Sequence, residues 1–326
     1  MTTYARVIGA RGLLGSALRR AIDGRRGWTD AGAAPLPWHD DASLVSAARD
    51  LTHDLLDRVG ENDHWTIIWA AGASVTASSP ESLASERHQL ELVLATIAAV
   101  ANDLGLAGRG TFFYPSSAGG VYAGSEHPPF TESTVPAPIA PYGWYKLSCE
   151  ASTAAFAESS GVAVLNGRIA NLFGPGQRLD KMQGLISHLA LAQLSPQPAS
   201  IFVSLDTLRD YIYVDDCAAL ILDALDRLRI ESAERRGLVI TKNLASGRAV
   251  TIADLLGYFR LLSKGHPHVM LGNSPASSLQ ARDLRLGSEV WPDLDRRDLT
   301  PLPVGIHATI DDIRFRLQEP GRVSPR

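Results

Sequence analysis

The chain has 326 residues, of which 45% are apolar, and its formal net charge is -4 at pH 7. This size and apolar content allow one large globular domain or two smaller ones, and the charge gives no field that would attract nucleic acid or an anionic membrane. Two cysteines, Cys149 and Cys217, have no metal-ligand spacing, so we expect core thiols, no metal site and, with no signal-peptide or transmembrane run, a cytoplasmic protein.

The first half of the chain alternates short apolar runs with longer helical patterns, which is typical of parallel strands joined by crossover helices. The predicted strands are 4–8, a short or edge strand in the proline-bearing AAPLPW (33–38), TIIWAA (66–71), TFFYPSS (111–117) and VAVLNGRIA (162–170). The predicted helices are 12–22, 41–59, 80–104 and 142–160. This order predicts the α/β class, with a doubly wound parallel sheet of the Rossmann type.

Beyond residue 170 the alternation of strand and helix patterns becomes less regular, which indicates a smaller C-terminal α/β lobe. Predicted here are helices at 184–194, 215–228 and 251–263, and strands near 200–204, 210–214, 243–247 and 268–272. We expect a dinucleotide-binding domain over 1–170, to which 205–230 crosses back. The substrate-binding lobe would comprise 171–204 and 231–318, and 319–326 would be a flexible tail.

Three glycines at three-residue spacing, Gly9, Gly12 and Gly15, follow the first strand and open the first helix. In that setting the backbone can approach a pyrophosphate, which the helix N-terminus binds through its amides and dipole. The acidic residue that usually follows about 20 residues later, and that holds the ribose of NAD, is not evident if the second strand ends near Trp38. Arg11, inside the loop, could bind a ribose 2′-phosphate, which favours NADP over NAD.

Tyr142 and Lys146 stand four residues apart in PYGWYK, so they share one face of the predicted helix. A phenol is a weak acid with a pKa of about 10, and a nearby ammonium favours its ionised form. This pairing would make Tyr142 a proton donor and acceptor. Together with the glycine loop, it predicts a nicotinamide-dependent redox site.

Several motifs together resemble extended short-chain dehydrogenases/reductases of the NAD-dependent epimerase/dehydratase family, which modify nucleotide-sugars. They are VIGARGLLGSAL, WAAG, YPSSAGGVY, PYGWYK, RIANLFGPGQ and RDYIYVDD, within residues 4–262. The glycine loop is also similar to that of GDP-fucose synthases, which use NADPH. The long helices beginning at Pro80 and Tyr142 resemble those that pair in family dimers, so the resemblance implies a homodimer.

The resemblance also implies roles for individual residues. Tyr142 would be the acid/base, and Lys146 would bind the nicotinamide ribose. Further cofactor contacts would come from Gly9, Arg11, Gly12, Leu13, Leu14, Gly15, Ala70, Ala71, Gly72 and Ser116.

A hydroxyl at the end of the fourth predicted strand would polarise the sugar oxygen. Counting back from the tyrosine favours Ser117, whereas alignment on the following VY places Ala118 there. Asn171 and Arg209 match positions that contact the diphosphate of a nucleotide-sugar, although Arg209 could instead pair with a neighbouring aspartate.

Departures from the family pattern narrow the reaction. Family dehydratases carry an acidic pair where this chain has Gly119 and Gly120, and a base for the epimerisation of GDP-fucose synthases is not evident. Two redox functions remain: reduction of a 4-keto-6-deoxy sugar nucleotide, which the preference for NADP favours, and NAD-dependent 4-epimerisation. A cofactor-binding regulator without turnover is the alternative of another class.

Overall fold

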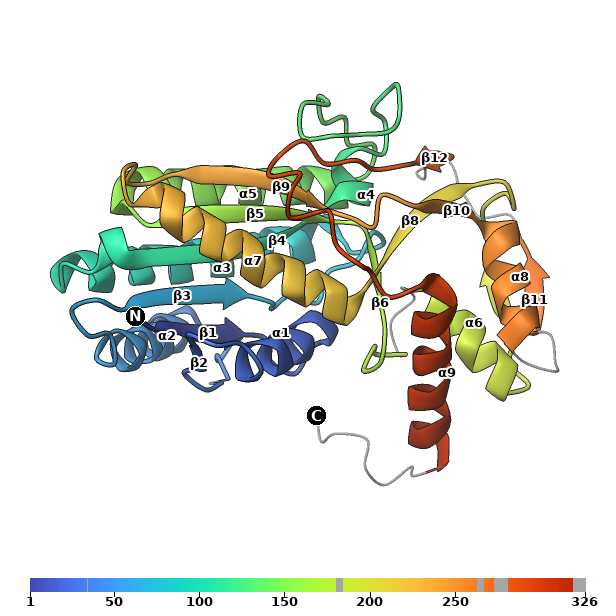
Figure 1. Cartoon of the computed structure of the whole chain (residues 1–326), viewed down its shortest axis with the longest axis horizontal. Helices are drawn as coiled ribbons and strands as arrows, with labels where there is room; N and C mark the ends of the chain where they lie inside the picture. Colours follow the sequence, from blue (N-terminus) through green and yellow to red (C-terminus); the bar gives the residue numbers. More distant parts are fainter. Residues whose placement is uncertain (34, 180–183, 263–266, 273–280, 319–326) are drawn as a thin grey trace.

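The computed structural model describes the chain except residues 34, 180–183, 263–266, 273–280 and 319–326. The described part contains a parallel central sheet in the order β2-β1-β3-β4-β5-β9. Its strands are β2 (Trp28–Asp30), β1 (Thr3–Ile8), β3 (His64–Trp69), β4 (Gly110–Ser117), β5 (Ala163–Ile169) and β9 (Val239–Leu244). Figure 1 shows this sheet inside the larger lobe. The predicted α/β class and doubly wound sheet are confirmed.

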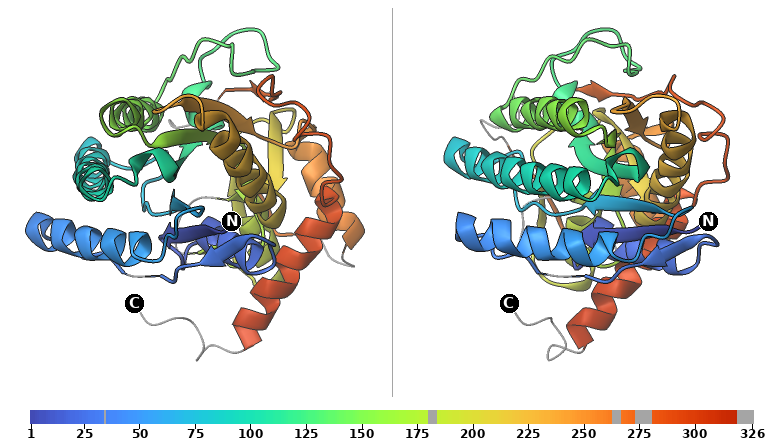
Figure 2. Two further views of the ribbon diagram at one scale, coloured as in Figure 1. Left: turned by 60° about the vertical axis from the view of Figure 1, so that its left-hand side comes forward. Right: turned by 90° about the vertical axis from the view of Figure 1, so that its left-hand side faces the viewer.

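Helices cover both faces of the sheet, as Figure 2 shows. Successive side chains of a strand point to opposite faces, so Phe113 of β4 joins one core cluster while Phe112 and Tyr114 join the other. One face is covered by α1 (Leu13–Asp23) and α7 (Val214–Ser232). The other is covered by α2 (Asp41–Leu56), α3 (Pro80–Asp103) and α5 (Pro141–Ser160).

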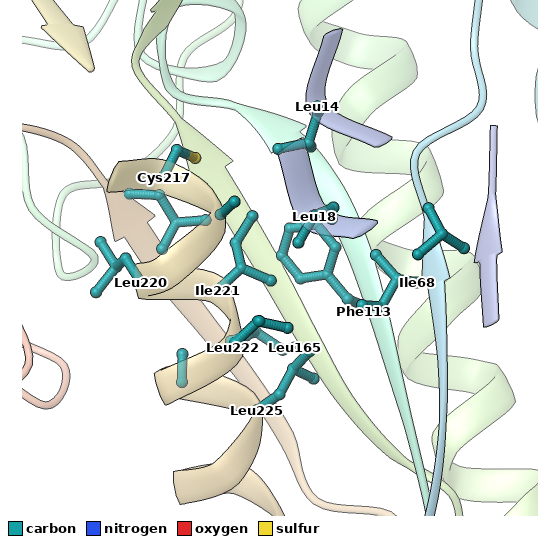
Figure 3. Packing of buried hydrophobic residues seen from close by; sticks show 14 of the residues in the cluster. Leu14, Leu18, Ile68, Phe113, Leu165, Cys217, Leu220, Ile221, Leu222 and Leu225 are labelled. Carbon is teal, nitrogen blue, oxygen red and sulfur yellow. The ribbon is translucent and has the colours of Figure 1, made fainter. Parts of the chain in front are cut away.

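The first core cluster joins α1 and α7 to the sheet. Figure 3 shows leucines of α1 facing Ile68, Phe113 and Leu165, which come from three neighbouring strands, and α7 packing beside them. Cys217 lies in this cluster and is fully buried, and Cys149 is buried in the cluster on the opposite face. Both thiols are therefore core residues, as predicted.

The smaller lobe is built around a second sheet in which β8 is central. β8 (Leu208–Tyr213) pairs with β6 (Asn171–Phe173), β10 (Ala249–Thr251) and β12 (Asp283–Leu284). β7 (Ala199–Ile201) pairs with β11 (Val269–Leu271), and α6 (Leu185–Leu194), α8 (Ile252–Leu262) and α9 (Leu302–Gln318) complete the lobe. Short helical turns occur at η1 (Ala107–Arg109) and α4 (Ala118–Val121). None of the helices in the described ranges combines the length and apolar character needed to cross a membrane.

The second strand is not where the sequence pattern predicted it. β2 comprises Trp28–Asp30 and pairs with β1, whereas the described residues of the AAPLPW segment form no strand. The Trp28 side chain is only 8% exposed and packs in the cluster formed by α1 and α7. A buried tryptophan anchors this short strand, and the two prolines that follow lack the amide hydrogen needed for pairing.

The division between the lobes also differs from the prediction. The chain returns to the larger lobe not only in α7 but also in β9, the outer strand beside β5, so 239–244 belongs to the central sheet. β8, within the segment predicted to cross back, belongs to the sheet of the smaller lobe. The expected flexible tail, 319–326, lies outside the described residues.

Candidate active site

The predicted glycine loop lies at the point where the strand order reverses. β1 and β3 are neighbours, but α1 leaves β1 toward one face and α3 follows β3 on the other. Ligands of open α/β sheets bind at such a point, beyond the carboxyl ends of the strands. Gly9, directly after β1, has φ +85°, and a Cβ there would lie 2.5 Å from the carbonyl oxygen of Ala70, directly after β3. This contact requires glycine at position 9.

The loop leads into the N-terminus of α1, which has no side-chain cap. A Cβ at Gly15 would lie 2.3 Å from the carbonyl oxygen of Gly9, so α1 begins pressed against the loop. The N-cap residue is Gly12, which provides no side chain to the first amides of the helix. Free N-terminal amides and the helix dipole bind anions. This cradle of backbone fits the pyrophosphate of a dinucleotide.

The other predicted cofactor contacts of this region differ in how much of each residue a ligand could reach. Ala71 belongs to the same close approach, because its amide nitrogen also lies 2.5 Å from a Cβ placed at position 9. Arg11 and Gly72 are exposed at the surface of the two loops. Leu13 and Leu14 turn their side chains to the core, so only their backbone remains for a ligand.

An acidic residue does end the second strand. Asp30 follows the glycine loop at about the spacing of the ribose-binding acid in dinucleotide folds. Its side chain is 9% exposed, and it accepts hydrogen bonds from Arg19 Nε at 2.6 Å and from the Gly32 amide at 2.8 Å. The prediction that no such acid was evident is wrong, because it depended on the misplaced strand. Counting residues from the loop would have found Asp30.

Tyr142 and Lys146 occupy the first two turns of α5, which begins at Pro141, a residue well suited to a first helical position. Lys146 Nζ lies 5.6 Å from the centroid of the Tyr142 ring. It donates hydrogen bonds to the Pro115 carbonyl at 2.9 Å and to the Tyr114 hydroxyl at 3.4 Å. The ammonium is therefore held between the end of β4 and α5, on the same face as the tyrosine, as the spacing predicted.

Two residues that the sequence argument did not select complete the surroundings of the ammonium. The rings of Tyr114 and Tyr145 lie 5.0 Å and 5.4 Å from Lys146 Nζ, within the range of cation–π attraction. Burial raises the pKa of the Tyr114 hydroxyl well above its ordinary value, so that residue remains a neutral phenol. Tyr145 in turn donates a hydrogen bond to Glu86 of α3. Adjacency to Lys146 could have pointed to Tyr145, whereas Glu86 gave no signal in the sequence.

The turn after β4 packs directly on Tyr142. Ser117 ends β4 and caps α4, with its hydroxyl accepting from the Gly120 amide at 3.2 Å, while Ala118 is fully buried. A Cβ at Gly120 would lie 3.2 Å from the Tyr142 ring, and one at Gly143 would lie 2.2 Å from the Gly120 carbonyl oxygen. A larger residue at position 120 would crowd the tyrosine ring, which would have to shift slightly to make room.

Ser116 faces away from this turn. Its hydroxyl donates to Glu150 Oε1 at 2.5 Å, and the residue is only 3% exposed. Glu150 also forms a two-pronged ion pair with Arg168 of β5, at 3.0 Å from Nε and 2.7 Å from Nη2. Although burial alone would lower it, the hydrogen bonds and charge of Glu150 raise the pKa of Arg168 above its usual value. The Ser116 side chain thus forms a buried link between β4 and α5, which leaves the backbone of Ser116 for the predicted cofactor contact.

The two residues predicted to bind a diphosphate lie on neighbouring strands of the smaller lobe. Asn171 in β6 is exposed, and its amide group donates to the Asp210 carbonyl at 2.8 Å. Arg209 in β8 is 7% exposed, and burial lowers the pKa of its guanidinium. Its Nη1 donates a hydrogen bond to the Leu208 carbonyl oxygen at 2.9 Å, so the guanidinium lies below the surface of the smaller lobe.

The chain resembles known proteins in sequence and in fold. The NAD dependent epimerase/dehydratase family matches residues 5–235. Over 219 residues the chain is 27% identical to the dTDP-4-dehydro-6-deoxyglucose reductase of Escherichia coli, a match that covers 67% of this chain. The matched stretch spans 65% of the length of that enzyme.

Two solved structures share the fold over nearly the whole chain. The Thermus thermophilus UDP-glucose 4-epimerase in complex with NAD has a TM-score of 0.75 at 18% identity, covering 95% of this chain and 99% of its own. RMD from Pseudomonas aeruginosa complexed with NADPH has a TM-score of 0.73 at 21% identity, covering 97% and 99%. The match over most of the sequence agrees with the glycine loop, the Tyr142 and Lys146 pair and the two-lobed fold: the chain belongs to the NAD-dependent epimerase/dehydratase family.

Proposed function

We propose that the protein is a nicotinamide-dependent oxidoreductase that acts at C4 of a nucleotide-activated sugar, with reduction of a 4-keto-6-deoxy sugar nucleotide as its first candidate reaction. The observation that carries the proposal is Lys146 Nζ beside the Tyr142 ring, at the end of the sheet where the glycine loop also lies. The similarity to the Escherichia coli reductase supports the choice of substrate.

The residues of the chain have distinct roles in this reaction. The nicotinamide, when bound, supplies the hydride to the carbonyl carbon. Tyr142 donates a proton to the carbonyl oxygen, and the Lys146 ammonium stabilises the negative charge left on the phenol. The Ser117 hydroxyl, one residue before the buried Ala118, is the group proposed to polarise the carbonyl. Asn171 and Arg209 hold the diphosphate of the substrate.

The turn beside Tyr142 argues against elimination of water. Dehydration after oxidation requires an acid and a base beside the sugar, and positions 119 and 120 are both glycine. A Cβ at position 120 would lie 3.2 Å from the Tyr142 ring, so a carboxylate there would require the ring to shift. The proposed reactions are therefore oxidation and reduction at C4, without loss of water from the sugar.

The two possible cofactors are supported by different residues. Arg11 could pair with the 2′-phosphate of NADP, as the sequence predicted. Asp30, in contrast, is paired with Arg19 and could accept the ribose hydroxyls of NAD at the position where such acids stand in dinucleotide folds. Because Asp30 ends β2 and is almost buried, we infer that it decides the preference in favour of NAD. Fluorescence titration with NADH and NADPH tests this, and a tighter complex with NADPH that Arg11→Ala weakens would refute it.

Asp30 also supports 4-epimerisation as a second candidate. An epimerase keeps its NAD through the catalytic cycle, whereas a reductase must exchange its cofactor. Mass spectrometry of the small molecules released on denaturing the purified protein separates the two. Bound NAD together with turnover in the absence of added cofactor indicates the epimerase, and turnover that depends on added NADH or NADPH indicates the reductase.

The decisive test of either reaction is Tyr142→Phe, which removes one oxygen atom. We expect turnover of a 4-keto or 4-hydroxy sugar nucleotide to fall by at least about 100-fold, the usual contribution of a positioned acid. Nicotinamide binding should be retained. Unchanged turnover would refute the mechanism, and tight cofactor binding without turnover of any sugar nucleotide by the native protein would indicate a regulator instead.

We also propose a cytoplasmic homodimer. The two buried free cysteines fit a reducing compartment. α3 and α5 lie side by side on one outer face of the larger lobe (Figure 2), where Trp144 is 58% exposed. A monomeric mass by light scattering would remove the dimer.

A further inference from the structure

One carboxylate connects two parts of the site that are far apart in the sequence. Glu86, on α3, accepts a hydrogen bond from the Ala73 amide at 2.6 Å through Oε1 and from the Tyr145 hydroxyl at 3.1 Å through Oε2. Ala73 directly follows the loop after β3, which packs against the glycine loop. Tyr145 directly precedes Lys146 in α5. Glu86 thus ties the predicted cofactor loop to the helix that carries the predicted acid/base.

Tyr145 contacts both side chains of the redox motif. Its ring centroid lies 6.2 Å from that of Tyr142 and 5.4 Å from Lys146 Nζ. Burial, with smaller contributions from Cys149 and Glu86, raises the pKa of Tyr145 far above its ordinary value, so the hydroxyl stays protonated and donates to the carboxylate. The Lys146 ammonium is surrounded by the rings of Tyr114, Tyr142 and Tyr145, and rotation of Tyr145 would remove one of these three contacts.

We propose that Glu86 and Tyr145 are a positioning pair that holds Lys146 and the loop after β3 in their cofactor-binding arrangement. The inference rests on the nicotinamide site of the proposed function, and it adds residues that neither the glycine loop nor the Tyr142 and Lys146 motif contains. Glu86 acts through its two hydrogen bonds, and Tyr145 acts through its hydroxyl, which binds Glu86 and so fixes the ring beside Lys146. Neither residue takes part in the chemical step.

The same two helices offer a matched control. Glu91, further along α3, accepts a hydrogen bond from the Ser152 hydroxyl of α5 at 2.8 Å. This is also a carboxylate bound to a hydroxyl across the two helices, but its partner lies more than one turn beyond Lys146. Glu91 also forms an exposed ion pair with Arg87 at 3.7 Å. Glu91→Ala therefore measures what the loss of a link between α3 and α5 does, together with the loss of that exposed pair.

The test is a fluorescence titration of the full chain with NADH and with NADPH, in the absence of any sugar. Tyr145→Phe, which loses the hydrogen bond to Glu86, should weaken binding of the preferred cofactor roughly tenfold. Glu86→Ala, which loses the hydrogen bonds to both Tyr145 and Ala73, should weaken it further. Glu86→Gln retains groups that can meet both partners and should restore the affinity to within about threefold of the native protein. Glu91→Ala should bind like the native protein.

Other results would overturn the inference. Native affinity in both Tyr145→Phe and Glu86→Ala would do so, and so would an equal loss in Glu91→Ala, which would indicate general packing between the helices. If Glu86→Ala does not fold in a thermal melt, Tyr145→Phe decides alone, because it removes a single oxygen atom. Failure of the native protein to bind either cofactor would instead overturn the proposed function, and the inference with it.

Discussion

The buried ion pair between Glu150 of α5 and Arg168 of β5 allows a quantitative prediction. Glu150→Gln removes the charge of a side chain that is 10% exposed and leaves Arg168, 8% exposed, without its counter-ion. The carboxylate accepts two hydrogen bonds from that arginine and a third from Ser116. An amide at this position has only one acceptor oxygen and must turn its NH2 group toward another donor.

The expected cost follows from these contacts. Each hydrogen bond to a charged group contributes about 1.5–3 kcal/mol, and the substitution loses one or two of them. Breaking a buried ion pair by removing one partner costs about 3–5 kcal/mol in total, and this figure already includes the lost hydrogen bonds. We therefore expect the free energy of unfolding to fall by roughly 3–5 kcal/mol. Replacing both partners, Glu150→Leu with Arg168→Met, should recover part of this loss because no charge is then buried.

Urea unfolding followed by tryptophan fluorescence and by circular dichroism measures the loss, and coincident transitions justify comparing free energies. Arg20→Met is the control, because Arg20 pairs with Asp215 at 2.6 Å but both side chains are at least half exposed. An exposed pair contributes at most about 1 kcal/mol. If Glu150→Gln cost no more than this control, the argument that the pair is desolvated and structurally required would be wrong.

Three further predictions concern the loop, a buried acid and the second strand. Gly15→Ala places a Cβ 2.3 Å from the carbonyl oxygen of Gly9 and should weaken nicotinamide binding at least about tenfold, as measured by titration. Gly24→Ala is the control: the nearest atom to its Cβ is 3.7 Å away, so binding should not change. Burial raises the pKa of Asp210, so its contribution to stability is full below the ordinary carboxyl pKa and is lost as pH rises through the raised value. Urea unfolding from about pH 4 to pH 7 should therefore show Asp210→Asn becoming more stable relative to the native protein as pH rises, and a constant difference would contradict this assignment. Trp28→Ala should lower the free energy of unfolding by about 3–5 kcal/mol, because the side chain is 8% exposed. Trp38→Ala, at a 37% exposed position, should lower it clearly less. Equal losses of stability in thermal melts would argue against Trp28 as the anchor of β2.

The sequence was sufficient where a pattern has one physical solution. Glycines at three-residue spacing predicted a loop between a strand and a helix, and β1 and α1 flank that loop. The spacing of Tyr142 and Lys146 predicted their shared face. The sequence was insufficient where burial decides which of two segments forms a strand. AAPLPW is as apolar as a strand, but pairing requires amide hydrogens that its prolines lack, and the three-residue strand at Trp28 is too short to show a period. Asp30 was missed as a direct result.

Side-chain direction was the second limit. Ser116 and Ser117 are adjacent, and an extended backbone sends adjacent side chains to opposite faces, so at most one could face the site. Which one it would be depended on Glu150, a residue 34 positions away that binds Ser116 from α5. The bridge made by Glu86 was likewise beyond reach, because the contact of α3 with α5 is set by tertiary packing and not by any local pattern.

The late return of the chain to the central sheet has a consequence for synthesis on the ribosome. α7 and β9 are synthesised after β6, α6, β7 and β8 of the smaller lobe. Yet α7 covers the face of β4 and β5 that carries Phe113 and Leu165. A nascent chain that has emerged only as far as β5 therefore presents this apolar face to its surroundings. Domains generally fold as units, and exposed apolar surface makes partly folded chains prone to aggregate. The larger lobe should thus depend on chaperone protection until about residue 244 has left the exit tunnel, and fragments that end after β5 should be recovered mainly as aggregates.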